Sequence, residues 1–293
     1  MEPKKIQEIE LSLFLNAVKL RHDYDFSRYA KSSLMRRVKE LVRVAGEDEI
    51  SGLIRRVLYD DSFIHEIVSR LSIQVSEMFR DAPSYLMIRQ EIVPMLKTHP
   101  RINIWVAGCA NGEEAYSMAI LLQEEGLFEK SQIFATDISP DAIKKARAGI
   151  FSPERLGQAA ANYEASGGKG RLSNYYTLRD EQVVMDPSIK KIIFFAEHNL
   201  ASDSVFCEAH LILCRNVLIY FDKPLQIRVL QLFLSSLVRG GFLSLGSAES
   251  LSFPEIEDQF ETVAAREKLF RKKYAPGRVG KESNSKPALR AQS

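Results

Sequence analysis

A glycine turn followed by two carboxylates lies between an apolar run and a segment of helical composition. Residues 104–114 read IWVAGCANGEE, and Gly108 and Gly112 allow the backbone to turn sharply and to approach a ligand closely. Asp137 lies 23 residues after Glu114, at the end of the next apolar run. An acid at the end of such a strand can accept hydrogen bonds from both hydroxyls of a ribose. This spacing predicts a site for an adenosine-containing ligand.

The acids Glu113 and Glu114 narrow the choice of ligand. A dinucleotide site has the pattern GxGxxG, which is absent here, and it receives a pyrophosphate that two carboxylates would repel. The same acids would attract the ammonium and sulfonium groups of S-adenosylmethionine (SAM). They also have a plain structural use, because acidic residues stabilise a helix N-terminus. The glycine turn together with Asp137 favours the cofactor site.

The elements that must position these residues alternate between strand and helix. Short apolar runs predict buried strands at 102–106, 133–135, 210–214 and 242–245. Helical compositions follow at 115–125, 140–148 and 224–238. Ser139 is the expected N-cap of the second of these helices, with Pro140 at its first position. The alternation predicts an α/β fold with a parallel sheet wrapped by helices.

Other segments depart from this alternation. Residues 1–72 carry apolar side chains at helical spacing and predict an all-helical domain, followed by an α/β domain at 73–274. A small antiparallel β-insertion is predicted at about 172–198, with strand candidates at 175–178, 182–185 and 191–196. Residues 275–293 are rich in Gly, Pro, Ser, Lys and Arg, and predict a disordered tail.

Composition excludes several classes of protein. The 293 residues are 45% hydrophobic and 27% charged, which is typical of a globular protein with one large or two modest domains. The net charge of +2 argues against a dedicated nucleic-acid binder. Three cysteines without a CxxC pair, and five histidines without metal spacing, predict no metal site and a cytoplasmic protein. We expect no signal peptide, because acids interrupt the apolar run at the N-terminus, and we expect no membrane insertion, because no run of about 18 apolar residues is present.

Basic residues are concentrated between residues 27 and 46. Six of them stand against the single acid Glu40, a net charge of +5 within a chain of net charge +2. Such a run is usually a solvated helix face, and its sign is also compatible with RNA. No aromatic RNA-binding motif accompanies it. The remaining interpretation is a face that docks an acidic protein partner.

Five sequence blocks resemble the CheR family of chemotaxis-receptor methyltransferases. In chain order they read SEMFRD (76–81), GCANGEEAYS (108–117), ATDI (135–138), CRNVLIYFD (214–222) and GGFLSLGSAES (240–250). The match spans about residues 20–272, and CRNVLIYFD is highly specific. The family transfers a methyl group from SAM to receptor glutamates, giving methyl esters and S-adenosylhomocysteine. The resemblance implies an N-terminal all-helical domain, then a Rossmann-like SAM-dependent methyltransferase domain with a small inserted antiparallel β-subdomain.

The resemblance also implies the residues of the site. The family's cofactor contacts fall on Gln74, Ser76, Arg80, Ala107, Gly108, Glu114, Asp137, Asn199, Leu200, Arg215 and Asn216. The family usually has Asn where this chain has Gln74, so that contact departs from the pattern. Arg215 and Tyr220 are expected on the substrate side, where Arg215 can hold a carboxylate and Tyr220 can orient it or face the sulfonium. Four basic residues are expected to dock the receptor: Arg36, Arg37, Lys39 and Arg43.

A glutamate acceptor suits this set of residues. Its carboxylate has a reference pKa of about 4.3, so it is ionised at neutral pH and needs no general base. The expected enzyme is a protein-glutamate O-methyltransferase of the EC 2.1.1.80 type that transfers the methyl group in line. Its expected partner is the cytoplasmic helical domain of chemoreceptors at receptor arrays, joined in some relatives by a receptor C-terminal peptide on the β-subdomain.

Two alternative functions remain, and the oligomeric state has a default. The chain could be a non-catalytic regulator that binds SAM or a receptor, or a methyltransferase for a small molecule or RNA. The intact residues Asp137, Arg215 and Tyr220 argue against a loss of activity. A monomer is the default oligomeric state.

Overall fold

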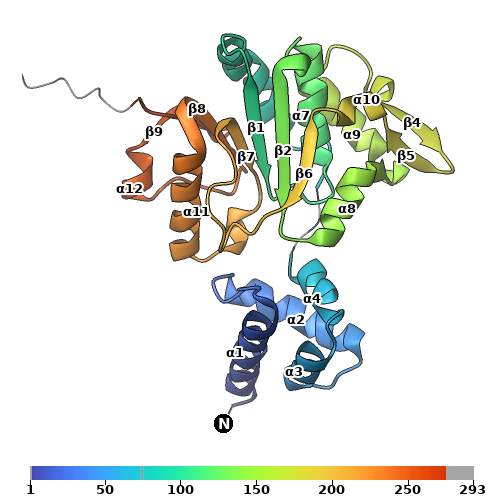
Figure 1. The fold of residues 1–293 in the computed structure, drawn as a ribbon, viewed down its shortest axis with the longest axis vertical. Helices are drawn as coiled ribbons and strands as arrows, with labels where there is room; N and C mark the ends of the chain where they lie inside the picture. The colour runs from blue at the N-terminus through green and yellow to red at the C-terminus, as the bar shows by residue number, and fades with distance from the viewer. Residues whose placement is uncertain (1, 73, 75, 275–293) are drawn as a thin grey trace, which may run out of the picture.

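The structure, a computed structural model, describes residues 2–72, 74 and 76–274. Four helices form an N-terminal unit that lies beneath a larger α/β unit (Figure 1). They are α1 (Pro3–His22), α2 (Lys31–Ala45), α3 (Ile50–Tyr59) and α4 (Phe63–Leu71). Each turns an apolar face inward, and in α2 the buried face consists of Leu34, Val38 and Leu41. The predicted N-terminal helices are confirmed.

A seven-stranded sheet forms the centre of the α/β unit. Its strand order is β6-β2-β1-β7-β8-β10-β9, and the first five strands run parallel. Their bounds are β1 (Ile102–Ala107), β2 (Ser131–Asp137), β6 (Ile193–Glu197), β7 (Ala209–Cys214) and β8 (Leu237–Leu245). Two further strands, β9 (Phe260–Ala264) and β10 (Leu269–Lys272), extend the sheet in antiparallel pairing. The predicted parallel sheet is confirmed, with an antiparallel edge added.

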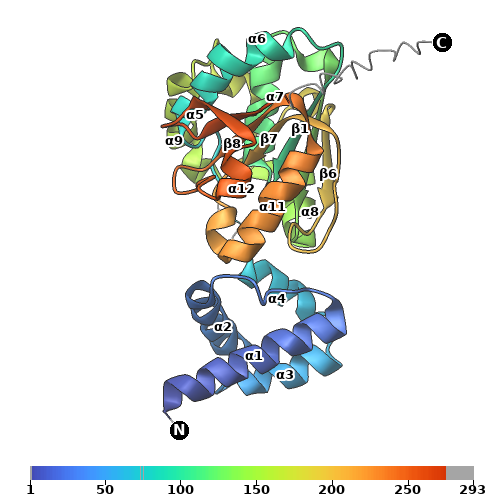
Figure 2. The ribbon, with the colours of Figure 1, turned by 90° about the vertical axis from the view of Figure 1, so that its left-hand side faces the viewer.

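Helices cover both faces of this sheet (Figure 2). Alternate residues along β1 belong to different cores, because successive side chains of a strand point to opposite faces. Trp105 packs with α11 (Lys223–Ser236), whereas Ile104 and Val106 pack with α7 (Glu113–Glu124). Further helical segments of this unit are α5 (Ala82–Met87), a π-helix (Ile88–Ile92), α6 (Val93–Leu96), α8 (Pro140–Ala148) and α12 (Pro254–Glu257). Ser139 caps α8 as predicted, accepting a hydrogen bond from the Ala142 amide at 3.3 Å.

The small antiparallel sheet differs from the prediction in one strand. Its order is β3-β5-β4, formed by β3 (Ile150–Phe151), β4 (Tyr176–Arg179) and β5 (Gln182–Met185). The candidate strand at 191–196 instead belongs to the central sheet as β6, parallel to β2. Its Ile193 and Phe195 belong to the same core as Ile104 and Val106 of β1. Apolar alternation along the sequence does not reveal such a long-range contact. Two helices that were not predicted, α9 (Leu156–Ala165) and α10 (Pro187–Lys190), flank the small sheet.

A short backbone junction joins the two units. Tyr29 forms an antiparallel bridge with Phe221, and their rings pack edge to face with centroids 5.0 Å apart. The Ala30 amide donates to the Tyr220 carbonyl, and the Asp222 amide donates to the Arg28 carbonyl, each at 2.8 Å. This junction brings the loop before α2 against the segment that follows β7.

Two expectations concern segments or features beyond the fold itself. The predicted tail at 275–293 lies outside the described residues. No helix in the described part of the chain is long and apolar enough to cross a membrane. Within the same residues, no group of three or more His, Cys, Asp or Glu side chains is arranged to hold a metal ion.

Candidate active site

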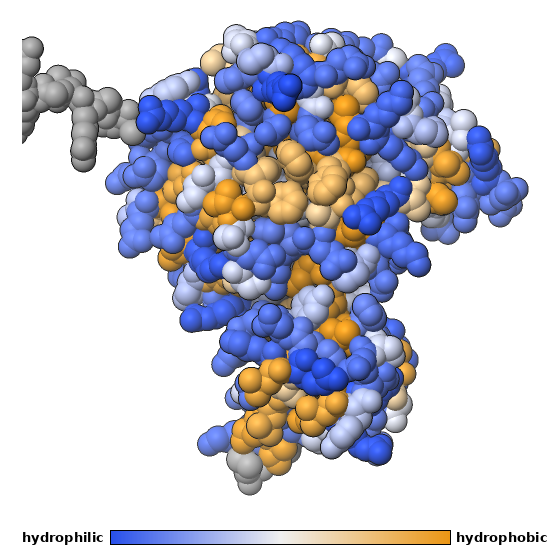
Figure 3. Space-filling view, viewed as in Figure 1, coloured by the Kyte–Doolittle hydropathy of each residue, from blue (hydrophilic) through white to orange (hydrophobic). Residues whose placement is uncertain are grey.

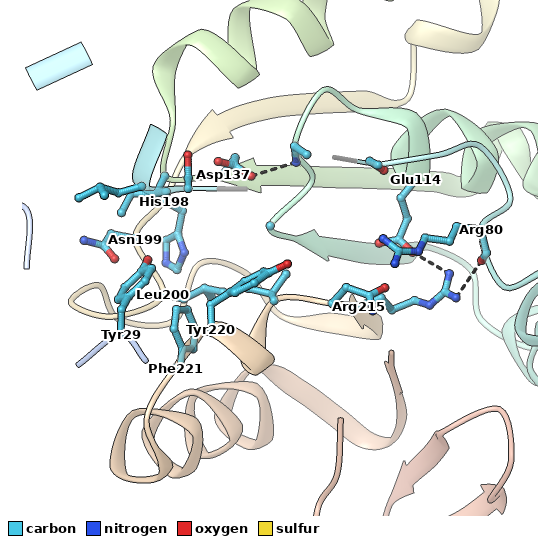
Figure 4. Close-up of a pocket in the computed structure, with 18 of the residues that line it drawn as sticks. Tyr29, Arg80, Glu114, Asp137, His198, Asn199, Leu200, Arg215, Tyr220 and Phe221 are labelled. Carbon is cyan, nitrogen blue, oxygen red and sulfur yellow. Dashed lines mark hydrogen bonds and ion pairs between the residues drawn. The ribbon is translucent and has the colours of Figure 1, made fainter. Parts of the chain in front are cut away.

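A pocket with about 960 Å³ of space between atoms, part of it open to solvent, lies where strands β1, β2 and β7 end. Ligands of open α/β sheets bind outside these carboxyl ends. Most of the predicted site residues line it: Ser76, Arg80, Gly108, Glu114, Asp137, Asn199, Leu200, Arg215, Asn216 and Tyr220. In Figure 4, Asp137, His198 and Asn199 lie towards one end, Arg80, Glu114 and Arg215 towards the other, and Tyr220 between them.

Glycine is required where the loop after β1 passes the segment after β7. Gly108 has φ +76°, and a Cβ atom there would lie 2.5 Å from Val217 Cγ2. A larger residue would therefore be strained and would also collide with a side chain of the pocket wall. The close approach seen here is to Val217, and the predicted close approach to a ligand stays a prediction.

Asp137 is the last residue of β2 and is 9% exposed. One carboxylate oxygen accepts from the Ala110 amide and the other from the Ser139 amide, both at 2.9 Å. These bonds fix the carboxylate, and each oxygen keeps a lone pair for a further donor. Burial raises the pKa of Asp137, against the effect of the backbone amides.

Arg215 is held by carboxylates at the opposite end of the pocket. Its guanidinium pairs with Glu114 at 3.0 Å and with Asp81 at 2.9 Å, and it also donates to the Arg80 carbonyl at 2.8 Å. Burial raises the pKa of Glu114 although Arg215 opposes that shift. Burial would lower the pKa of Arg215, but its acidic partners outweigh burial and the pKa is raised.

Glu249 shapes the loop after β7, and sequence reasoning gave it no role. It is 4% exposed and accepts hydrogen bonds from the amides of Asn216 (3.0 Å), Val217 (2.8 Å), Leu218 (2.7 Å) and Gly246 (2.6 Å). These bonds hold Asn216 in the left-handed region, at φ +61°. The only sequence signal was its place in the GGFLSLGSAES block.

The N-terminal unit also contributes to the pocket wall, which the sequence did not predict. Tyr29 and Arg37 both line the pocket. The Arg37 guanidinium carbon lies 4.9 Å from the centroid of the Tyr220 ring, and one nitrogen donates to the Leu71 carbonyl. The other terminal nitrogen, Nη2, is buried without a hydrogen-bond partner among the described residues. Burial lowers the pKa of Arg37.

The other predicted residues do not line this pocket. The Gln74 amide donates to Ser139 Oγ at 2.7 Å and faces a neighbouring cavity, while Ala107 is fully buried at the end of β1. Arg36, Lys39 and Arg43 are exposed on α2, where Arg43 pairs with Glu40. Arg37 thus separates from the other three basic residues predicted for docking.

Comparison with known proteins now adds to this geometry. Residues 74–269 match the family described as CheR methyltransferase, SAM binding domain, which covers more than half of the chain. The chain belongs to the CheR methyltransferase family. This CheR-family chain is therefore a SAM-dependent methyltransferase of the chemotaxis type, and SAM is its cofactor.

Curated relatives extend over most of this CheR-family chain. A Pseudomonas putida protein, Cher3, is 44% identical over 93% of this chain and 100% of its own length. Chemotaxis protein methyltransferase of Listeria innocua is 28% identical over 82% of this chain and 90% of its own. A solved N-methyltransferase, NodS of Bradyrhizobium japonicum with S-adenosylhomocysteine, covers 80% of this chain and 98% of its own, at 15% identity and a TM-score of 0.37.

The pocket residues suit SAM in both charge and shape. Glu114 offers a buried carboxylate to an ammonium group, and Asp137 offers fixed oxygens to a ribose. Arg80 lines the same end as Glu114 and carries the positive charge that a methionyl carboxylate would attract. A side chain at Gly108 would fill the space against Val217. The CheR chain can thus hold the cofactor with the polar groups present.

Proposed function

We propose that the protein transfers the methyl group of SAM to glutamate side chains of chemoreceptors, as a protein-glutamate O-methyltransferase of the EC 2.1.1.80 type. The observation that carries this proposal is the arrangement around Tyr220. Arg37, a cation of the N-terminal unit, lies over the Tyr220 ring and lines the pocket. An anionic acceptor can therefore approach the cofactor beside a positive charge. Relatives named chemotaxis protein methyltransferase support the same substrate class.

Methyl transfer to a carboxylate needs no general base from the protein. Bound SAM would supply a methyl group attached to a positively charged sulfur. A glutamate carboxylate is already ionised, so no side chain has to remove a proton. The protein has to exclude water and align the carboxylate oxygen with the methyl group. Tyr220 lies between the two ends of the pocket, where its ring can contact that group (Figure 4).

Arg215 and Arg37 would have different roles in this reaction. Arg215 already has two carboxylate partners, so we assign it to positioning Glu114 and the cofactor rather than to holding the substrate. Arg37 lines the pocket beside Tyr220 and forms no ion pair among the described residues. We assign Arg37 to the acceptor carboxylate, because its guanidinium is a cation that no carboxylate of the chain already occupies.

The receptor would dock on the N-terminal unit. Arg36, Lys39 and Arg43 are exposed on α2, the same helix that carries Arg37 into the pocket. An acidic helical receptor domain would be attracted to this face. A receptor C-terminal peptide could pair with β4, which lies at one edge of the small sheet. With a receptor as its partner, the protein would act in the cytoplasm at receptor arrays.

A methyl-transfer assay tests the proposed function. The purified protein is incubated with radiolabelled SAM and the cytoplasmic fragment of a chemoreceptor from the same organism. Mild alkali then releases volatile labelled methanol only from a methyl ester. Label in alkali-stable form would point to a different acceptor. Binding of SAM without any transfer would identify a non-catalytic regulator and contradict the proposal.

A further inference from the structure

The segment between α4 and α5 carries strained backbone beside the cofactor pocket. Residues 76–81, the strap, contain Phe79 at φ +52° and Asp81 at φ +54°, both in the left-handed region that few non-glycine residues adopt. Three strap residues line the pocket: Ser76, Glu77 and Arg80. Such strained conformations persist only where the surrounding structure holds them. The contacts that hold the strap therefore also set the position of these pocket residues.

Helix α7 and the loop after β7 hold the strap at two points. The Phe79 amide donates to Ser117 Oγ of α7 at 2.9 Å. The Arg80 carbonyl accepts a hydrogen bond from Arg215 at 2.8 Å, and Arg215 also pairs with Asp81. Both contacts come from elements that themselves line the cofactor pocket.

Helix α9 and the 3-10 turn before it (Pro153–Arg155) hold the strap at two further points. The Asn162 side-chain amide donates to the Met78 carbonyl at 3.2 Å. Arg155 Nη1 donates to the Ser76 carbonyl at 3.0 Å. Figure 2 shows α9 beside α5, the helix that directly follows the strap. Two strap carbonyls thus depend on side chains that lie 84 and 79 residues further along the chain.

Helix α9 is itself fixed to the rest of the α/β unit. Tyr163 donates to the buried carboxylate of Glu124 at the end of α7, and its ring packs edge to face on Phe79 with centroids 5.3 Å apart. Arg89 donates to the Ser166 carbonyl, just after α9, at 3.1 Å. Since α7 begins at the pocket and ends at this contact, α7 and α9 together hold the strap in one position relative to the cofactor.

We propose that Asn162 and Arg155 are positioning residues for SAM. Neither side chain lines the cofactor pocket, and each acts through the strap carbonyl to which it donates. The bond from Asn162 fixes the Met78 carbonyl and so keeps Phe79 in its left-handed conformation, which holds Arg80 at the pocket (Figure 4). The helix that flanks the small sheet thus serves cofactor binding, apart from any docking of a receptor peptide.

Calorimetric titration of the full chain with S-adenosylhomocysteine tests this proposal. Asn162→Asp keeps the size of the side chain and can still accept the hydrogen bond that Gln158 donates at 2.8 Å, but it loses the donor to Met78. We expect its affinity to fall roughly tenfold, because the Met78 carbonyl loses its donor and faces a negative charge. Asn162→Gln keeps an amide donor and should lose less. Arg155→Ala should also lose less, since this side chain is exposed and water can replace its bond.

Two controls separate the lost hydrogen bond from the added charge. Ala161→Asp places the same charge on the neighbouring, exposed residue of α9. Leu13→Asp places it in the other unit, on the hydrophobic surface over α1 that Figure 3 shows at the lower end of the molecule. Both variants should bind S-adenosylhomocysteine as the wild type does, because neither residue contacts the strap.

Kinetics and urea unfolding distinguish positioning from a purely structural role. In Asn162→Asp the KM for SAM should rise about as much as the affinity falls, while kcat at saturating SAM stays near the wild-type value. An Asn162→Asp protein that is less stable yet binds S-adenosylhomocysteine as tightly as wild type would overturn the proposal. An equal loss of affinity in Ala161→Asp would overturn it too. The binding measurement needs no acceptor, so its result is independent of whether the protein methylates glutamate.

Discussion

At the scale of single residues, the two arginines Arg215 and Arg37 differ in whether they already pair with carboxylates. Arg215 is 8% exposed and pairs with Glu114 and Asp81, although its Nε is buried without a hydrogen-bond partner among the described residues. Releasing it towards a substrate would break two ion pairs and leave buried charges without partners, which costs several kcal/mol. Arg37 donates to the Leu71 carbonyl and forms no ion pair among the described residues. Binding a substrate carboxylate would therefore break no ion pair of Arg37.

Replacing Arg37 therefore separates substrate binding from cofactor binding. We expect Arg37→Gln to lower kcat/KM for the receptor by roughly 10- to 100-fold, since hydrogen bonds to charged groups contribute about 1.5–3 kcal/mol. Arg37→Lys should recover part of this loss, because it keeps the charge but not the fork of donors. Receptor methylation is measured at saturating SAM, and S-adenosylhomocysteine affinity by calorimetry.

The matched control is Arg55→Gln, an exposed arginine of the same helical unit, which should behave like wild type. Equal losses of cofactor affinity and receptor methylation in Arg37→Gln would show that Arg37 only supports the pocket wall. An unchanged kcat/KM would contradict its assignment to the acceptor.

The two buried acids predict how cofactor affinity depends on pH. Burial raises the pKa of Glu114 and of Asp137, and each serves an ammonium or ribose best when it is ionised. Affinity for S-adenosylhomocysteine should be full above the raised pKa values and fall as the pH drops through them. The loss should begin at a higher pH than for an ordinary glutamate, whose reference pKa is about 4.3. Calorimetric titrations from neutral to acid pH measure it.

Glu114→Gln tests the assignment of that pH dependence. This variant should bind more weakly at neutral pH and lose the part of the acid dependence that Glu114 causes. A variant with the same pH profile as wild type would mean that other groups govern the loss of affinity.

At the scale of elements, the loop after β7 depends on one acid from the segment after β8. Glu249 accepts four backbone amides, two of them from Asn216 and Val217 of the pocket wall. We expect Glu249→Ala to lower the free energy of unfolding by about 3 kcal/mol or more, because several buried amides lose their acceptor. Urea unfolding measures this change.

Cofactor affinity should fall in the same Glu249 variant. Glu249→Gln keeps one carbonyl oxygen and should lie between the two proteins in both measurements. A Glu249→Ala protein with wild-type stability would show that the loop holds its shape without these bonds.

Helix α2 predicts a different split, because its exposed and pocket-facing residues have separate partners. The double reversal Arg36→Glu with Arg43→Glu should raise the KM for the receptor roughly tenfold at low salt, and less at high salt. Affinity for S-adenosylhomocysteine should not change, since neither side chain lines the pocket. Initial-rate methylation at two salt concentrations measures the effect. The reversal of Arg239 and Arg266, both exposed elsewhere, changes the net charge equally and should leave the KM unaltered.

At the scale of the whole molecule, the two units share one hydrophobic core. Phe26 and Val38 of the N-terminal unit belong to the same buried cluster as Phe221, Leu225 and the residues around α11. The opposite face of the sheet forms the second cluster, and the strands connect the two. The pocket lies between the units and takes its wall from both.

This arrangement predicts a single thermal transition. Calorimetry of the full chain should show both units unfolding together, and S-adenosylhomocysteine at about 100 times its Kd should add about 2.7 kcal/mol to the stability. Two transitions, of which only one shifts with ligand, would show that the N-terminal unit is neither joined to the core nor part of the binding site.

The sequence by itself determined what depends on local pattern. The period of apolar residues distinguishes the helical unit from the alternating strands and helices, and the glycines at 108 and 112 mark the turn between β1 and α7. The blocks that resemble CheR proteins carried the family, the cofactor and most of the pocket residues. These features could be predicted because each depends on a few adjacent residues.

The tertiary structure decided which distant segments meet. Apolar alternation at 191–196 indicated a strand but not its sheet, and only packing against β2 placed β6. Arg37 looked like one of four docking residues until the junction of Tyr29 with Phe221 turned it towards Tyr220. Likewise Arg215 proved to be held by Glu114 and Asp81. A residue's type limits what it can bind, whereas its partners follow from contacts between segments that no local period encodes.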